Sequence, residues 1–151
     1  MEAQDLIKGL SGRLGIELDA GDACSFEADG MVVSMYFPQA SDFLAMTCDI
    51  GEPPPERLEG LYKALLGANY MFGGTMGATI ALNPDDGRIT LCRAMPTAAL
   101  DVDQLCSQLE HFLNTAETWQ KIVSDYREGN EMPASGDAAG MASVPDAFLR
   151  V

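Results

Sequence analysis

The feature that most constrains the fold of this chain is one apolar stripe near its carboxyl end. Residues 102–123 place apolar side chains at helical spacing through about six turns, with polar residues between them. The stripe consists of Val102, Leu105, Leu109, Phe112, Leu113, Ala116, Trp119 and Val123. Asp101 and Gln104 form a capping pattern that predicts where this helix begins. A long helix with one apolar face must bury that face against another layer, which the rest of the chain has to supply.

Strand patterns upstream of the stripe supply that layer. Apolar residues predict strands at 24–27, 31–37 and 42–50, and the Asp29-Gly30 pair between the first two is a hairpin-turn signal. One face of the second strand carries Met31, Val33, Met35 and Phe37. A short helix over 5–14 is expected before these strands from the spacing of Leu6, Ile7, Leu10 and Leu14. The three strands therefore form an antiparallel meander.

A second helix and two more strands are expected before the stripe begins. Pro53–Pro55 end the third strand and begin a helix, because proline fits the first helical turn. We expect this helix to end near Asn69, a residue that tolerates the left-handed conformation of helix ends. The last two strands are expected at 75–82 and 88–95, joined by the turn-forming residues 83–87.

The predicted order is helix, three strands, helix, two strands and helix. This order indicates the α+β class, with a five-stranded antiparallel sheet and helices packed on it. A chain of 151 residues is one domain in size, and we place this domain over residues 1–127. Residues 128–151 are rich in Gly, Ala, Ser and Pro, a composition that predicts a flexible tail.

The charge of the chain excludes several classes of partner. Nine Lys and Arg against 23 Asp and Glu give a formal net charge of −14, so the phosphates of nucleic acids and anionic lipids would be repelled.

No apolar run approaches the roughly 18 residues of a membrane-spanning helix. Glu2 and Asp5 lie where a signal peptide would carry positive charge, so we expect a cytoplasmic protein without membrane insertion.

No group of residues in the sequence predicts catalysis. His111 is the only histidine, and Cys24, Cys48, Cys92 and Cys106 lack the short spacings of zinc sites. The glycine-rich segment 73–77 precedes a strand and lacks the lysine of a phosphate-binding loop. We therefore expect no enzyme, no catalytic residues, no metal and no cofactor.

A family resemblance is carried by residues between Leu65 and Trp119. Its parts are the segments 65–69, 74–78 and 82–87, followed by Leu91, Leu100, Asp101, Leu105, Leu109, Phe112, Leu113 and Trp119. This pattern closely resembles the CesT (Tir chaperone) family, the dimeric chaperones that bind single effectors of bacterial type III secretion systems. The resemblance covers residues 6 to about 125. Because its motif consists of turn and packing residues, it is diagnostic of fold more than of partner.

The resemblance implies a function and two binding surfaces. The expected protein is a cytoplasmic bacterial homodimer that binds a non-globular, amino-terminal segment of a secreted effector. It would keep that segment soluble and export-competent without ATP hydrolysis and pass it to the export machinery. The effector-binding candidates are Leu6, Leu10, Leu14, Val33, Met35 and Phe37. The dimer-interface candidates are Leu58, Leu61, Tyr62, Leu65, Met76, Ala78 and Ile80.

Two further implications remain open at this stage. Part of the effector could add a strand to an edge of the sheet, and the acidic surface would favour basic effector segments. The alternative function is a regulatory or sensory protein that shares this fold and binds a folded partner.

Overall fold

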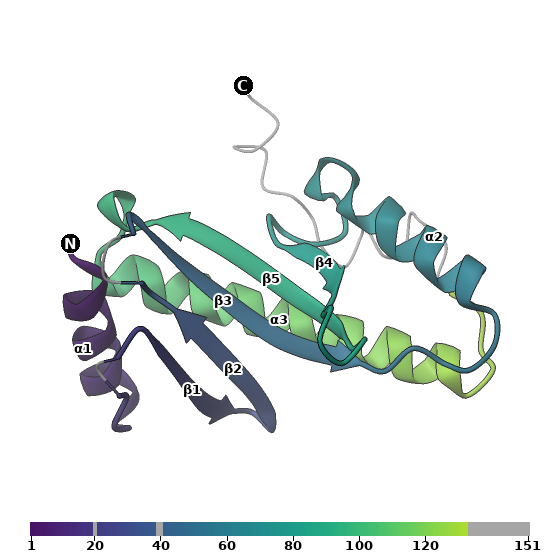
Figure 1. Ribbon diagram of the computed structural model, residues 1–151, viewed down its shortest axis with the longest axis horizontal. Helices are drawn as coiled ribbons and strands as arrows, with labels where there is room; N and C mark the ends of the chain where they lie inside the picture. The colour runs from purple at the N-terminus through teal and green to yellow at the C-terminus, as the bar shows by residue number, and fades with distance from the viewer. Residues whose placement is uncertain (20, 39–40, 133–151) are drawn as a thin grey trace. The chain divides into compact units, whose positions relative to one another are not determined.

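The computed structural model describes residues 1–19, 21–38 and 41–132 and has the predicted element order (Figure 1). Its helices and strands are α1 (Ala3–Leu14), β1 (Ala23–Ala28), β2 (Met31–Tyr36), β3 (Phe43–Gly51), α2 (Leu58–Asn69), η1 (Tyr70–Phe72), β4 (Thr79–Leu82), β5 (Ile89–Pro96), η2 (Thr97–Ala99) and α3 (Val102–Arg127). The strands form one five-stranded antiparallel sheet in the order β1-β2-β3-β5-β4. The predicted α+β class is confirmed. Of the predicted tail, residues 133–151 lie outside the described part of the chain.

Two compact units divide the chain. Unit 1 consists of residues 1–48 and 92–113, and unit 2 consists of residues 49–91 and the chain from residue 114 onward. The boundaries fall inside β3, β5 and α3, so each of these elements contributes to both units.

Unit 1 contains the predicted meander with its side chains alternating as expected. Asp29 (φ 51°) and Gly30 (φ 79°) form the two-residue turn, and Ala28 pairs with Met31 directly across it. Along β2 the side chains are alternately buried and accessible, with Val33 fully buried. Helix α1 lies so close to α3 at Gly9 that a side chain there would collide with Val102. Packing therefore explains the glycine at position 9.

Unit 2 departs from the predicted elements at the start of α2 and at the start of β4. Helix α2 begins at Leu58, so Pro53–Pro55 precede the helix and do not form its first turn. The fourth strand begins at Thr79 because Met76 (φ 54°) and Gly77 (φ 87°) turn the chain just before it. Helix α2 ends at Asn69 as predicted, but Asn69 itself is right-handed, with φ −71° and ψ −22°. Its side chain instead makes two hydrogen bonds to the backbone of Ile80 in β4. Asn69 Nδ2 donates to the Ile80 carbonyl at 2.9 Å, and the Ile80 N–H donates to Asn69 Oδ1 at 2.8 Å.

Helix α3 begins and packs as its sequence predicts. Asp101 Oδ1 accepts a hydrogen bond from the Gln104 N–H at 2.8 Å, and Gln104 Oε1 accepts one from the Asp101 N–H at 2.9 Å. The apolar stripe is buried along both units, except for the half-buried Val102. In unit 2, the buried indole of Trp119 donates to the Gly74 carbonyl at 2.8 Å. This bond ties α3 to the glycine-rich turn before β4.

Candidate functional site

The structure places five of the six effector-binding candidates in the core of unit 1. Their exposed fractions are 0% for Leu6, Leu10, Val33 and Met35 and 1% for Phe37. In this structure, other parts of the chain cover these side chains. Only Leu14, with 42% of its surface exposed, is accessible.

The opposite face of the same strands is accessible and almost uncharged. We call it the outer face of unit 1 and define it as Ala23, Ser25, Glu27, Val32, Ser34, Tyr36, Phe43, Ala45 and Thr47. Three large apolar members, Val32, Tyr36 and Phe43, are 60%, 46% and 45% exposed. Glu27 is the single charged residue of this face, in a chain with a net charge of −14. Such a surface is suited to an apolar partner.

The dimer-interface candidates are also largely internal. Leu61, Leu65, Ala78 and Ile80 are buried within unit 2. Leu58, Tyr62 and Met76 are half-buried. The helical period of α2 did identify an apolar face, but that face packs inside the unit.

A different group of apolar side chains is exposed on unit 2. We call it the unit 2 patch: Leu66 (70% exposed), Tyr70 (79%), Met71 (72%), Phe72 (52%) and Leu82 (45%). The two Asn69 hydrogen bonds hold the end of α2 against β4 and so bring these segments together.

The backbone of this patch is strained within η1. Met71 and Phe72 have φ values of 52° and 57°, a left-handed conformation that non-glycine residues adopt at a cost. A strained turn that displays two large apolar side chains to solvent is typical of an interaction surface.

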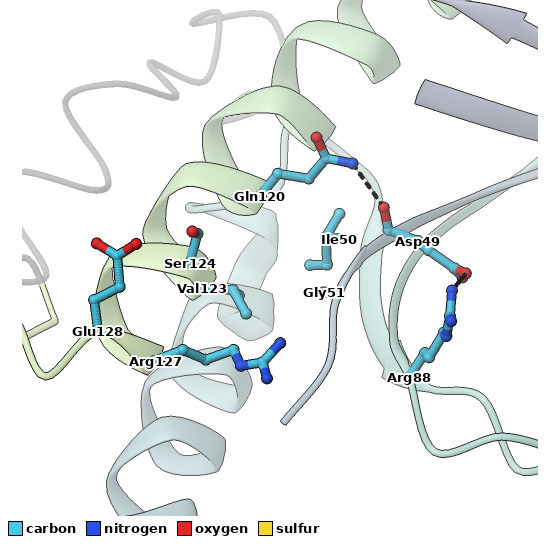
Figure 2. Close-up of a pocket in the computed structure, with 9 residues that line it drawn as sticks. All are labelled: Asp49, Ile50, Gly51, Arg88, Gln120, Val123, Ser124, Arg127 and Glu128. Atoms are coloured by element: carbon cyan, nitrogen blue, oxygen red, sulfur yellow. Dashed lines mark hydrogen bonds and ion pairs between the residues drawn. The ribbon is translucent and has the colours of Figure 1, made fainter. Parts of the chain in front are cut away.

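A pocket of about 660 Å³ in unit 2 lies between the end of β3, Arg88 just before β5, and the last turns of α3 (Figure 2). Arg88 contacts Asp49 at 3.4 Å, and Gln120 Nε2 donates to the Asp49 carbonyl at 2.9 Å. Glu52 forms ion pairs with Arg88 at 3.4 Å and with Arg127 at 3.9 Å. Both arginines of the pocket are thus neutralised by carboxylates, which is the arrangement of a structural ion-pair network.

The described residues carry few features of other functional classes. Among them, no group of three His, Cys, Asp or Glu is arranged to hold a metal ion. None of the helices described is long and apolar enough to cross a membrane.

Comparison with solved structures shows the same fold in several proteins. A chain of the ExsC–ExsE complex is 20% identical, with a TM-score of 0.66 over 82% of this chain and 97% of that chain. A chain of the ExoU–SpcU complex from the type III secretion system of Pseudomonas aeruginosa is 18% identical, with a TM-score of 0.63 over 77% of this chain and 95% of that chain. The Yersinia pestis type III secretion chaperone SycH, in complex with a fragment of YscM2, is 18% identical. Its TM-score is 0.60 over 77% of this chain and 98% of that chain.

The comparison with curated proteins gave no match. The model of the Tir chaperone protein (CesT) family matches residues 5–120, which is most of the chain and includes parts of both units. This chain belongs to the CesT family.

Proposed function

We propose that this protein is a homodimeric chaperone that binds a non-globular segment of a type III secretion effector and keeps it soluble for export. The family match and the chaperone–effector complexes among its structural neighbours support this function. In this proposal the segment is amino-terminal, the protein acts in the bacterial cytoplasm by binding alone, and the export machinery receives the effector from it.

The observation that carries the proposal is the outer face of unit 1. Val32, Tyr36 and Phe43 form an exposed apolar surface on a sheet whose other face is filled by the core. An extended segment can lay its apolar side chains on such a face, and burial contributes about 25 cal/mol per Å² of apolar surface covered. A partner on this face needs no rearrangement of unit 1.

We assign the dimer interface to the unit 2 patch. Its five apolar side chains stay exposed in one protomer. With a two-fold axis through the patch, the patch of one protomer would pack against the same patch of the other. The exposed strained turn at Met71 and Phe72 would be covered in that dimer.

The effector surface is tested with Val32→Asp combined with Tyr36→Asp. This variant is expected to lose the secreted partner captured from the native bacterial lysate while it stays dimeric by light scattering. The matched control is Ser107→Asp with Asn114→Asp, which adds the same charge at exposed positions of α3 and should retain the partner. Capture of the partner by both variants would contradict this surface.

The dimer interface is tested with Leu66→Glu combined with Phe72→Glu. We expect folded monomers in size-exclusion chromatography with light scattering. Lys63→Glu changes the net charge by the same amount at an exposed position of α2 and should remain dimeric. A stable dimer of the double variant at micromolar concentration would exclude this interface.

Limited proteolysis of the captured complex separates the chaperone from the regulatory alternative. A chaperone is expected to protect one short segment of a partner that is otherwise cleaved. A partner that stays resistant over its whole length would favour a regulator that binds folded protein.

A further inference from the structure

We propose that Arg57 and Tyr126 are positioning residues for the dimer: their contact fixes where α2 begins and thereby where the unit 2 patch lies. This inference rests on the proposed function and deepens it, because it names residues outside the patch on which assembly depends. Both residues lie in unit 2. Three observations carry the inference: a strained, locally uncapped start of α2, a reciprocal contact between the two residues, and the close approach of Gly60 to Tyr126.

The residues next to the start of α2 do not fix it in place. Arg57 precedes the helix with φ 61° and ψ 31°, a left-handed conformation that costs a non-glycine residue free energy. Its side chain makes no capping hydrogen bond to the first turn of α2. Among the residues of α2, all of which the structure describes, only Leu61 and Leu65 are buried. Because a strained conformation persists only where its surroundings hold it, a contact from elsewhere in the chain must hold Arg57.

Tyr126, in the last turn of α3, supplies that contact. Arg57 Nη2 donates to the Tyr126 carbonyl at 2.5 Å, and Tyr126 Oη donates to the Arg57 carbonyl at 2.6 Å. The guanidinium carbon lies 4.3 Å from the centre of the Tyr126 ring, which is a cation–π contact. We call these three contacts the clasp. They join residues 69 positions apart, and Figure 1 shows the start of α2 beside the end of α3.

Gly60 shows how closely α2 approaches the clasp. A Cβ at Gly60 would lie 3.1 Å from Tyr126 Oη, which is tighter than ordinary van der Waals contact. A glycine at an exposed position of a helix costs stability relative to alanine. The tyrosine hydroxyl therefore explains this glycine, and the clasp fixes the distance between the two helices as well as the start of α2.

Helix α2 connects the clasp to the unit 2 patch. Each N–H inside a helix is bonded to the carbonyl four residues before it, so a helix of this length moves as one body. Leu66 lies on α2 and Tyr70–Phe72 follow it directly, so a shift at Arg57 displaces these patch residues. At its other end α2 is held by the Asn69 bonds to Ile80. A two-fold interface needs the patch in one orientation, and a surface already held in that orientation loses less entropy when it binds.

The test is the dimer dissociation constant of the full-length protein, measured by analytical ultracentrifugation. Tyr126→Phe keeps the ring and loses the hydroxyl, and we expect the dissociation constant to rise about fivefold. Arg57→Ala removes both guanidinium contacts and should raise it about tenfold. Arg57→Gly loses the same contacts but tolerates the left-handed backbone, so it should dimerise more tightly than Arg57→Ala. The reverse order would contradict the role of the left-handed start.

Asp101→Ala is the control for a general loss of stability. It removes the cap at the other end of α3, in unit 1, and leaves α2 and the clasp intact. We expect this variant to dimerise like the wild type, although it is less stable. Circular dichroism confirms that each variant is folded at the temperature of the measurement.

A second pair of variants tests the close approach of α2 to Tyr126. Gly60→Ala should weaken dimerisation in the wild-type background, where its Cβ meets the hydroxyl. In the Tyr126→Phe background the hydroxyl is gone, so Gly60→Ala should cause no further weakening.

The outcomes separate this inference from the proposed function. Unchanged dimerisation of Tyr126→Phe and Arg57→Ala would overturn the role of the clasp and leave the dimer interface standing. Equal weakening by Asp101→Ala would also overturn it, because loss of stability alone would then explain the effect. An equal effect of Gly60→Ala in both backgrounds would contradict the close approach. A wild type that stays monomeric at micromolar concentration would exclude the proposed dimer itself, and this inference with it.

Discussion

The two hydrogen bonds of Asn69 give the most direct test of how unit 2 is held together. Asn69→Ala removes a donor and an acceptor that pair with Ile80, whose side chain is 6% exposed. At about 0.5–1.5 kcal/mol net for each bond, the two contribute about 1–3 kcal/mol. Alanine regains up to about 0.5 kcal/mol of helix propensity at this last residue of α2. We expect the free energy of unfolding to fall by about 1.5 kcal/mol, which lowers Tm by about 5 °C for a chain of this size.

The assay is thermal unfolding followed by circular dichroism at one fixed protein concentration, because dimerisation makes Tm depend on concentration. Asn69→Asp keeps the acceptor for the Ile80 N–H and loses the donor to its carbonyl, so it should also be destabilised. Asn114→Ala, at an exposed position of α3, is the control and should match or exceed the wild type. A Tm of Asn69→Ala within 1 °C (about 0.3 kcal/mol) of the control would refute the role assigned to these bonds.

Three other predictions concern individual contacts. Trp119→Phe leaves the buried Gly74 carbonyl without its donor, so the free energy of unfolding in urea should fall by about 1–3 kcal/mol. Asp101→Ala removes the carboxylate that caps α3 and should cost about 1 kcal/mol, with faster amide exchange confined to the first turn of that helix. Because burial raises the pKa of the Cys24 thiol, its alkylation at pH 8 should be slow and should accelerate as the pH rises, as measured by mass spectrometry.

The second strand shows how far an alternating pattern determines a surface. Its sequence correctly separated Val33 and Met35 from Val32 and Tyr36, because alternate side chains of a strand point to opposite faces. The more apolar face was assigned to a partner, yet the structure buries it in unit 1. The alternating pattern alone does not determine whether the chain's own helices or another protein cover an apolar face.

The region around Asn69 shows a second limit. The helix ends at Asn69 as predicted, but Asn69 is right-handed, so its tolerance of the left-handed conformation is not what ends the helix. The Asn69 side chain forms hydrogen bonds with the backbone of Ile80, eleven residues further along the chain. The fourth strand is also shorter than predicted, because the turn at Met76 and Gly77 leaves only Thr79–Leu82 to pair with the neighbouring strand.

The order of helices and strands, the hairpin turn at Asp29-Gly30, the Asp101–Gln104 cap and the family resemblance are all predictable from the sequence. These features depend on residue spacing within a few positions, where backbone sterics and periodicity decide the outcome. The folded structure was needed to show which apolar faces are covered and that the Asn69 side chain binds the backbone of Ile80. Burial and edge pairing depend on contacts between residues far apart in the chain, and local spacing does not encode such contacts.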